Sequence, residues 1–292
     1  MANLKEIRTR ITSVKTTRQV TSAMKMVSAA KLKKAQDAIL QIRPYAEKLS
    51  DLLSSLSSAL ENADNSVYTV QRNPEKVLIV LISSNRGLCG GFNSNISKKA
   101  IILARTVYKK QLEKGHLDFL VIGKQGGKVL NLYHIKTIGD KNYLFDNLTF
   151  DMVAEEAKSI MADFVAAKYD RVELVYNKFI NAASQELVNE QFLPVLPSAV
   201  NNKKTNLDYI YEPSLEYIVE ELIPRSLKIQ FYKALLDSHA AEHGARMTAM
   251  HKATDNASDL INELTLTFNK ARQAAITNAI LEVTNGAEAL NG

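Results

Sequence analysis

Apolar side chains recur at spacings of three and four residues near the N-terminus, which is the period of an α-helix. The pattern opens with Leu4, Ile7, Ile11 and Val14. It continues further along with Leu32, Ala35, Ile39, Ile42, Ala46, Leu49, Leu53, Leu56 and Leu60. Alternating steps of three and four are typical of a coiled-coil seam. We therefore predict a long helix over residues 1–60, kinked at Pro44, that pairs with a second helix.

The C-terminal end carries a second helical pattern, over residues 213–288. Heptad spacing holds through Leu227, Phe231, Ala234, Ser238, Ala241 and Ala245, and alanines then recur every four residues at 249, 253 and 257. This small-residue ridge matches a window at 22–30 in the N-terminal helix. Placing the two windows opposite each other predicts antiparallel pairing in which partner numbers sum to about 270.

The distribution of helix-breaking residues supports two long helices. The first 73 residues contain no glycine and only Pro44, and the last 68 contain no proline. The register leaves roughly 20 C-terminal residues beyond the N-terminus, with apolar side chains on most of the helix circumference. A lone helix that is apolar nearly all round has to be enclosed. We expect other subunits to enclose this tip.

A polar stretch interrupts the N-terminal seam at residues 15–23 (KTTRQVTSA). The step from Val14 to Leu32 is 18 residues, which is two heptads plus four, and a four-residue insertion straightens a supercoil locally. The stretch either fixes the register or contacts another molecule. The sequence leaves both interpretations open.

The middle of the chain alternates apolar runs with helical patterns. Residues 76–84 (KVLIVLISS), 117–123 and 171–179 are typical of buried strands, and the segments 93–113 and 151–168 have helical spacing. Alternation of this kind predicts a parallel sheet covered by helices. The expected fold class is α/β, a long antiparallel coiled coil of the N- and C-terminal helices plus a central Rossmann-like α/β domain over residues 74–200.

Composition and charge narrow the class of protein. No apolar run approaches the roughly 20 residues that span a bilayer, and no secretory signal is recognisable, so we expect a protein in the cytosol or facing it. The single cysteine excludes an internal disulfide, and the five histidines show no metal-ligand spacing. Residues 1–50 carry 11 Lys or Arg against three Asp or Glu. Such a basic helix indicates either a solvated face or an acidic partner, protein or phosphate.

Two glycine-rich loops are the candidates for chemistry, 83–93 (SSNRGLCGGFN) and 123–128 (GKQGGK). The first lacks the Gly-Lys-Ser/Thr ending of a P-loop, and its glycines are wrongly spaced for a dinucleotide fingerprint. We expect a tight strand-to-helix turn there and the start of a short helix at the second loop. Cys89 is expected to be a buried thiol rather than a nucleophile. Because the sequence shows no catalytic constellation or metal cluster, we do not expect the chain alone to be an enzyme.

Three long segments resemble the gamma subunit of rotary F-type ATP synthases. They are LKEIRTRITSVKTTRQVTSAMKMVSAAKLKKAQ at the start, SSNRGLCGGFN in the middle, and ARMTAMHKATDNASDLINELTLTFNKARQAAIT near the end. The resemblance implies a central-stalk rotor within a ring of three alpha and three beta subunits, with the α/β domain as a foot on the c-subunit ring that also holds the epsilon subunit. It further implies that Mg-ATP and Mg-ADP bind alpha and beta, and that this chain binds no cofactor.

The resemblance also assigns contact residues. Those implied for the beta subunits are Met24, Lys25, Arg246, Arg272, Gln273 and Thr277, and those for the c ring are Tyr209 and Tyr211. Family members often carry a carboxylate near Ala279, so this chain departs from the family at that upper contact. The implied location is the cytoplasmic face of a bacterial inner membrane, with peripheral attachment through the c ring.

Two other classes of function compete with a rotor. One is a coiled-coil scaffold whose α/β domain binds a nucleotide or another anion. The other is a nucleic-acid binder that uses the basic N-terminal helix. The nearly neutral C-terminal helix argues against the second, so no nucleic-acid partner is expected.

Overall fold

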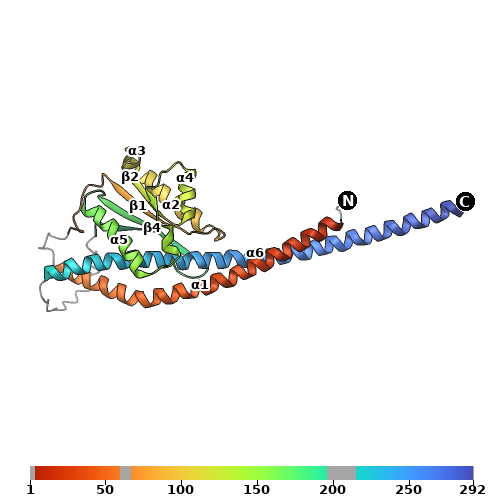
Figure 1. Ribbon diagram of the computed structural model, residues 1–292, viewed down its shortest axis with the longest axis horizontal. Helices are drawn as coiled ribbons and strands as arrows, with labels where there is room; N and C mark the ends of the chain where they lie inside the picture. The colour runs from red at the N-terminus through yellow and green to blue at the C-terminus, as the bar shows by residue number, and fades with distance from the viewer. Residues whose placement is uncertain (1–3, 60–66, 196–214, 292) are drawn as a thin grey trace. The chain divides into compact units, whose positions relative to one another are not determined.

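The computed structural model describes residues 4–59, 67–195 and 215–291 (Figure 1). Its helices are α1 Leu4–Ala59, α2 Phe92–Thr106, α3 Lys109–Glu113, α4 Lys124–Leu132, α5 Phe150–Val165 and α6 Leu215–Asn291, with a 3₁₀ turn η1 at Asn142–Phe145. Its strands are β1 Val77–Ile82, β2 Leu117–Ile122, β3 Gly139–Asp140, β4 Arg171–Phe179 and β5 Gln185–Leu193. The two long terminal helices and the α/β segment between them confirm the expected fold class.

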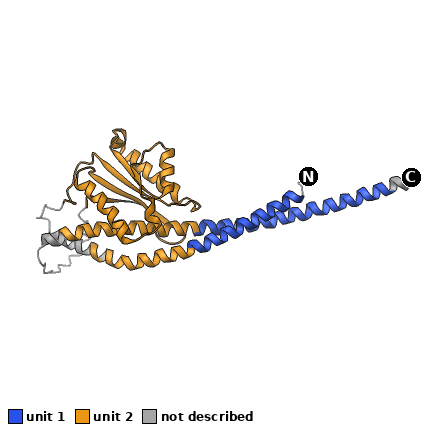
Figure 2. Ribbon diagram, viewed as in Figure 1, with its two compact units in different colours: residues 1–28, 247–292 blue, residues 29–246 orange. Residues whose placement is uncertain are grey.

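The chain divides into two compact units (Figure 2). The first, which we call the rod unit, consists of residues 1–28 and 247–292, and the second, the sheet unit, consists of residues 29–246. The predicted ranges 1–60, 74–200 and 213–288 follow secondary structure instead. Because α1 and α6 each contribute to both units, compactness groups the chain differently from those ranges.

The rod unit is a pair of antiparallel helices (Figure 2). Ile7 of α1 is buried, and so are Ala257, Ile261 and Leu264 of α6, so the apolar ladder faces the partner helix as predicted. The Thr21 and Thr254 hydroxyls share a hydrogen bond of 2.9 Å. This pair places the register close to the predicted partner sum of about 270.

The sheet unit contains a five-stranded sheet in the order β3-β2-β1-β4-β5. All neighbouring strands run parallel except β5, which is antiparallel to β4. Strands β1, β2 and β4 lie where the apolar runs predicted them. The predicted helix 93–113 is two helices, α2 and α3, because Tyr108 turns inward and its hydroxyl donates to Glu173 Oε1 at 2.6 Å.

Helices cover both faces of the sheet, and each face has its own core. One core packs α2 residues such as Ile96 and Ala100 on the sheet, and the other is formed with α5 and α6. Phe231 of α6 packs against Phe192 of β5, with ring centroids 5.6 Å apart. Leu227, Phe231 and Ala234, which heptad spacing assigned to a coiled-coil seam, belong to this sheet core. That assignment was wrong, because the apolar face of α6 covers the sheet here.

Across the described ranges, no helix combines the length and apolar character needed to span a bilayer.

Candidate functional site

The rod unit carries a basic groove between its two helices. The groove has a volume of about 440 Å³ and is lined by Arg8, Ile11, Thr12, Lys15, Phe268 and Arg272. Within the described ranges, its three cations form no ion pair with a carboxylate. Positive side chains without internal partners attract anionic groups of another molecule.

The predicted contact residues of the rod unit differ in exposure. Arg272, Gln273 and Thr277 are exposed, whereas Met24 and Lys25 are half-buried. The Thr277 hydroxyl donates to the carbonyl of Gln273 at 3.0 Å, which is a bond within the helix. Because Arg272 and Gln273 are exposed, their side chains face solvent.

The C-terminal part of α6 is exposed throughout residues 272–287. Its large apolar side chains include Ile276, Ile280, Leu281 and Val283, and Val283 is 74% exposed. This matches the prediction of a lone apolar tip. Exposed apolar surface of this extent marks an interaction site.

The polar stretch 15–23 divides into two parts, one that contacts α6 and one that faces solvent. Residues 15–20 are exposed, and the hydroxyls of Thr16 and Thr17 bond to carbonyls one turn back in the helix. Thr21, in contrast, pairs with Thr254 of α6. One part of the stretch thus defines the register, and the other part is accessible to a partner.

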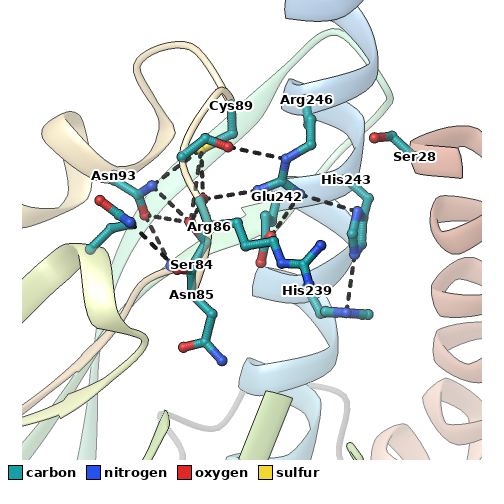
Figure 3. A network of polar contacts seen from close by, with 12 residues as sticks. Ser28, Ser84, Asn85, Arg86, Cys89, Asn93, His239, Glu242, His243 and Arg246 are labelled. Atoms are coloured by element: carbon teal, nitrogen blue, oxygen red, sulfur yellow. Dashed lines mark hydrogen bonds and ion pairs between the residues drawn. The ribbon is translucent and has the colours of Figure 1, made fainter. Parts of the chain in front are cut away.

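Arg246 lies in the sheet unit and is buried there, with 6% exposure (Figure 3). Its Nη1 forms an ion pair with Glu242 Oε1 at 2.7 Å. Its Nε and Nη2 donate to the carbonyls of Gly87 at 3.2 Å and Arg86 at 3.0 Å. The predicted contact between Arg246 and a beta subunit stays a prediction, but this guanidinium is committed to groups of its own chain.

Two histidines extend this network along α6. The His243 and His239 Nε2 atoms are 3.2 Å apart, and His243 Nδ1 is 3.3 Å from Arg246 Nη1. Burial lowers the pKa of His239 to about 4 and that of His243 to about 3, with the charge of Arg246 acting in the same direction. Burial also raises the pKa of Glu242, which the charge of Arg246 opposes. Both imidazoles are therefore neutral near pH 7.

The glycine-rich loop after β1 is held by its own polar side chains. Ser84 Oγ donates to the carbonyl of Arg86 at 2.6 Å, and the Ser84 amide donates to Asn93 Oδ1 at 2.9 Å. Cys89 is buried and accepts a bond from Asn93 Nδ2 at 3.2 Å. Burial raises the pKa of the Cys89 thiol, which disfavours the reactive thiolate. The prediction of a buried thiol is confirmed.

The second glycine-rich segment opens helix α4, as predicted. The amides of Lys124, Gln125 and Gly126 donate to Asn85 Oδ1, the Ser84 carbonyl and Ser83 Oγ, at 3.2, 3.0 and 2.9 Å. A Cβ on Gly123 would lie 2.3 Å from the Ser83 carbonyl oxygen. Gly123 therefore permits the segment that opens α4 to lie close to the loop after β1. Because the loop after β1 already bonds these amides, they offer little to a phosphate.

Helix α6 approaches the loops at the carboxyl ends of β1 and β4, where the strand order reverses. Ligands of open α/β sheets bind at such switch points. Here Ala241 of α6 packs against Cys89 and Phe92, and a Cβ on Gly244 would lie 3.2 Å from the Ala182 carbonyl oxygen. The chain's own helix thus contacts the loops that would hold a ligand.

Two predictions stand apart from this geometry. Tyr209 and Tyr211 fall outside the described residues, so their predicted c-ring contact stays a prediction. The bonds between Arg246 and the loop join residues 159 and 160 positions apart, and no sequence spacing predicts them. The only local signal is the i,i+4 spacing of Glu242 and Arg246, which suits an ion pair within a helix.

Comparison with known proteins gives a consistent result. The family model described as ATP synthase matches residues 3–290. The ATP synthase gamma chain of Flavobacterium johnsoniae is 58% identical over 292 residues, covering 100% of both chains. That of Flavobacterium psychrophilum is 56% identical, also with 100% coverage of both.

A solved structure agrees with these relatives. A chain of the central stalk and c-ring structure of Tetrahymena thermophila mitochondrial ATP synthase aligns with a TM-score of 0.60 at 27% identity. The alignment covers 80% of this chain and 99% of that one.

Proposed function

We propose, from the premise that this chain belongs to the gamma-chain family of ATP synthases, that it is the central-stalk rotor of a proton-translocating enzyme. In this role it carries rotation between a membrane ring of c subunits and a catalytic hexamer of three alpha and three beta subunits. The chain supplies mechanical coupling, and the chemistry takes place on its partners. By itself it is not an enzyme.

The observation that carries this proposal is the exposed apolar tip at residues 272–287. Ile276, Ile280 and Val283 are each more than half exposed on a single helix. Burying a large aliphatic side chain is worth about 1.5–3 kcal/mol relative to leaving it in water. A sleeve formed by the alpha and beta subunits provides this burial and still leaves a narrow rod free to turn.

The charges of the rod unit suit successive partners. Arg8, Lys15 and Arg272 line the groove without an internal counter-ion in the described ranges, and Arg272 and Gln273 are exposed at the start of the apolar tip. Attraction to acidic loops of the beta subunits acts over roughly a Debye length of 8–10 Å and requires no fixed geometry. Such contacts, which also involve Met24, Lys25 and Thr277, engage three partners in turn without trapping the rotor in one orientation.

The sheet unit provides the foot of the rotor in this proposal. It rests on the c ring, with Tyr209 and Tyr211 in contact, and also binds the epsilon subunit. Attachment to the membrane is then peripheral, through the c ring, on the cytoplasmic face of a bacterial inner membrane. The bacterial source of the gamma-chain relatives supports this location.

We further propose that this chain binds no cofactor and that Mg-ATP and Mg-ADP bind the alpha and beta subunits. The occupied amides at the start of α4 support this proposal, because the amides of residues 124–126 are not available to a phosphate at that helix terminus. The competing scaffold with a nucleotide or anion site would show thermal stabilisation of the isolated chain by ATP or phosphate. We expect no shift in melting temperature with either ligand.

Reassembly tests the proposed rotor. The isolated chain should hydrolyse no ATP, and mixing it with alpha and beta subunits should yield a complex in which hydrolysis is coupled to proton pumping once the membrane sector is added. A truncation after residue 271 removes the apolar tip and serves as a comparison. Failure of the full chain to assemble with alpha and beta subunits would refute the proposal.

A further inference from the structure

Arg246 uses all three guanidinium nitrogens, and its contacts link α6 to the turn at residues 86–88. Nη1 holds Glu242 on the same helix, while Nε and Nη2 hold the carbonyls of Gly87 and Arg86 (Figure 3). A planar guanidinium presents these donors in a fixed fork, so the three contacts set its orientation. The turn is thereby fastened to the helix by two bonds from one side chain.

The contacts of Arg246 also fix the protons of the neighbouring histidines. Arginine only donates hydrogen bonds, so His243 Nδ1 accepts from Arg246 Nη1. The proton of neutral His243 then lies on Nε2, which donates to His239 Nε2. The His239 ring stacks on Phe145, with centroids 5.9 Å apart. The ion pair with Glu242 and the hydrogen bonds of the two neutral histidines thus support the same orientation of the Arg246 side chain.

The turn that Arg246 holds has a strained backbone. Leu88 has a φ of 60°, in the left-handed region that a residue with a Cβ rarely adopts, and its side chain is 64% exposed. A strained backbone of this kind persists only where its surroundings determine it. Arg246 bonds the two carbonyls directly before Leu88, and Ser84 Oγ bonds one of them as well.

We propose that Arg246 is a positioning residue that holds the strained 86–88 turn rigidly on α6, so that turn and helix rotate as one body. The proposal rests on the rotor function above. In it, Arg246 affects coupling indirectly, by holding the turn in place. Arg86 and Leu88 are exposed, so the turn has a cationic and an apolar side chain at the surface.

Cys89 is the natural probe for this proposal, because it is the only cysteine in the chain, is buried, and directly follows the turn. Its rate of reaction with a neutral maleimide, measured on the isolated full chain, reports how often the turn opens. Arg246→Lys keeps a charge for Glu242 but cannot span both carbonyls. Glu242→Gln removes the ion pair and keeps both carbonyl bonds.

The two substitutions should separate turn opening from overall stability. We expect Arg246→Lys to raise the Cys89 reaction rate about tenfold, which is the factor expected for the loss of one or two net hydrogen bonds. The melting temperature should change little. Glu242→Gln should lower the melting temperature and leave the reaction rate within about twofold. The control is Arg105→Gln, which alters a cation–π contact between α2 and Tyr133, the residue after α4, and should change neither quantity.

Relief of the strain provides a second variant. Asparagine adopts the left-handed conformation more readily than leucine, so Leu88→Asn should return the reaction rate of Arg246→Lys toward that of the wild type. A Cys89 rate that stays unchanged in Arg246→Lys would overturn the proposal. So would a rate that simply follows melting temperature across the variants, or a missing rescue by Leu88→Asn.

The functional consequence is measured in the assembled enzyme. Arg246→Lys should lower the number of protons pumped per ATP hydrolysed, and an unchanged ratio would contradict rigid coupling. Because the thiol measurement needs no partner subunits, its result is independent of assembly. Failure of the wild-type chain to assemble refutes the rotor function. If the wild-type chain assembles but the turn stays closed in Arg246→Lys, only the positioning role is refuted.

Discussion

Asp237 shows how one buried residue sets a pH dependence in the sheet unit. It is 2% exposed on α6, and its Oδ1 has no hydrogen-bond partner among the residues that the structure describes. Burial raises its pKa from 3.8 to about 6, although Lys233, Arg43 and Lys178 act in the opposite direction. The ionised carboxylate therefore destabilises the folded chain at neutral pH.

The first prediction concerns Asp237→Asn. Because the folded pKa is raised, the destabilisation is absent below about pH 3.8, grows between that value and about pH 6, and is complete above it. The variant should be more stable than the wild type by about 2–3 kcal/mol at pH 8 and nearly equal to it at pH 4. Denaturant unfolding at both pH values measures the difference. An advantage that persists undiminished at pH 4 would contradict the assignment.

The second prediction concerns Lys25, which is half-buried in the rod unit. Replacing it with glutamate turns attraction toward acidic beta-subunit loops into repulsion at one stage of each turn. Lys25→Glu should assemble normally but pump fewer protons per ATP hydrolysed, by about twofold or more. Lys25→Gln is the matched control and should lie between the two. Wild-type pumping per ATP in the glutamate variant would count against the contact.

At the scale of elements, what the sequence could predict depends on how apolar each element is. Strands β1, β2 and β4 are buried on both faces over most of their length, and β1 and β2 appear as apolar runs. Strand β5 (QELVNEQFL) is an edge strand with mixed burial, and Glu190 within it accepts bonds from Tyr176 and Gln230. The hydrogen-bond partners of its polar residues lie on other elements of the fold, so no pattern within the strand's own sequence predicts it.

The candidate sites divide in the same way. The apolar tip and the exposed Arg272 follow from helical periodicity and resemblance, because they depend on one helix and its register. The bonds from Arg246 to residues 86 and 87 depend on where α6 crosses the end of the sheet. Heptad spacing predicted a helical partner for Phe231 and could not distinguish that partner from a sheet.

The third prediction concerns the glycines of α4. A Cβ on Gly126 would lie 2.6 Å from Ser83 Oγ, whereas one on Gly127 would have 4.0 Å to its nearest neighbour, Val121 Cγ1. Gly126→Ala should therefore destabilise the sheet unit by about 1–3 kcal/mol, the usual cost of overpacking. Gly127→Ala should be neutral or stabilise the helix by about 0.5–1 kcal/mol. Thermal unfolding of the two variants checks this ranking, and equal effects would refute it.

At the scale of the whole molecule, the two compact units have different chemical character. The rod unit presents an exposed apolar helix and a groove whose cations, Arg8, Lys15 and Arg272, form no ion pair within the described part of the chain, and these features require partners. The sheet unit has apolar cores on both faces of its sheet, and α6 packs on it through Leu227, Phe231 and Ala241. The surface of the rod unit is suited to contacts with other subunits. The sheet unit packs against the part of α6 that precedes the rod unit.

The proposed rotor makes a direct mechanical prediction. A probe fixed to the sheet unit of this chain, in a complex with surface-anchored alpha and beta subunits, should turn in one direction when ATP is added. The rotation should proceed in three main steps per turn, because three catalytic sites act in sequence on one asymmetric rod. Steady ATP hydrolysis by the same complex with a stationary probe would contradict the account.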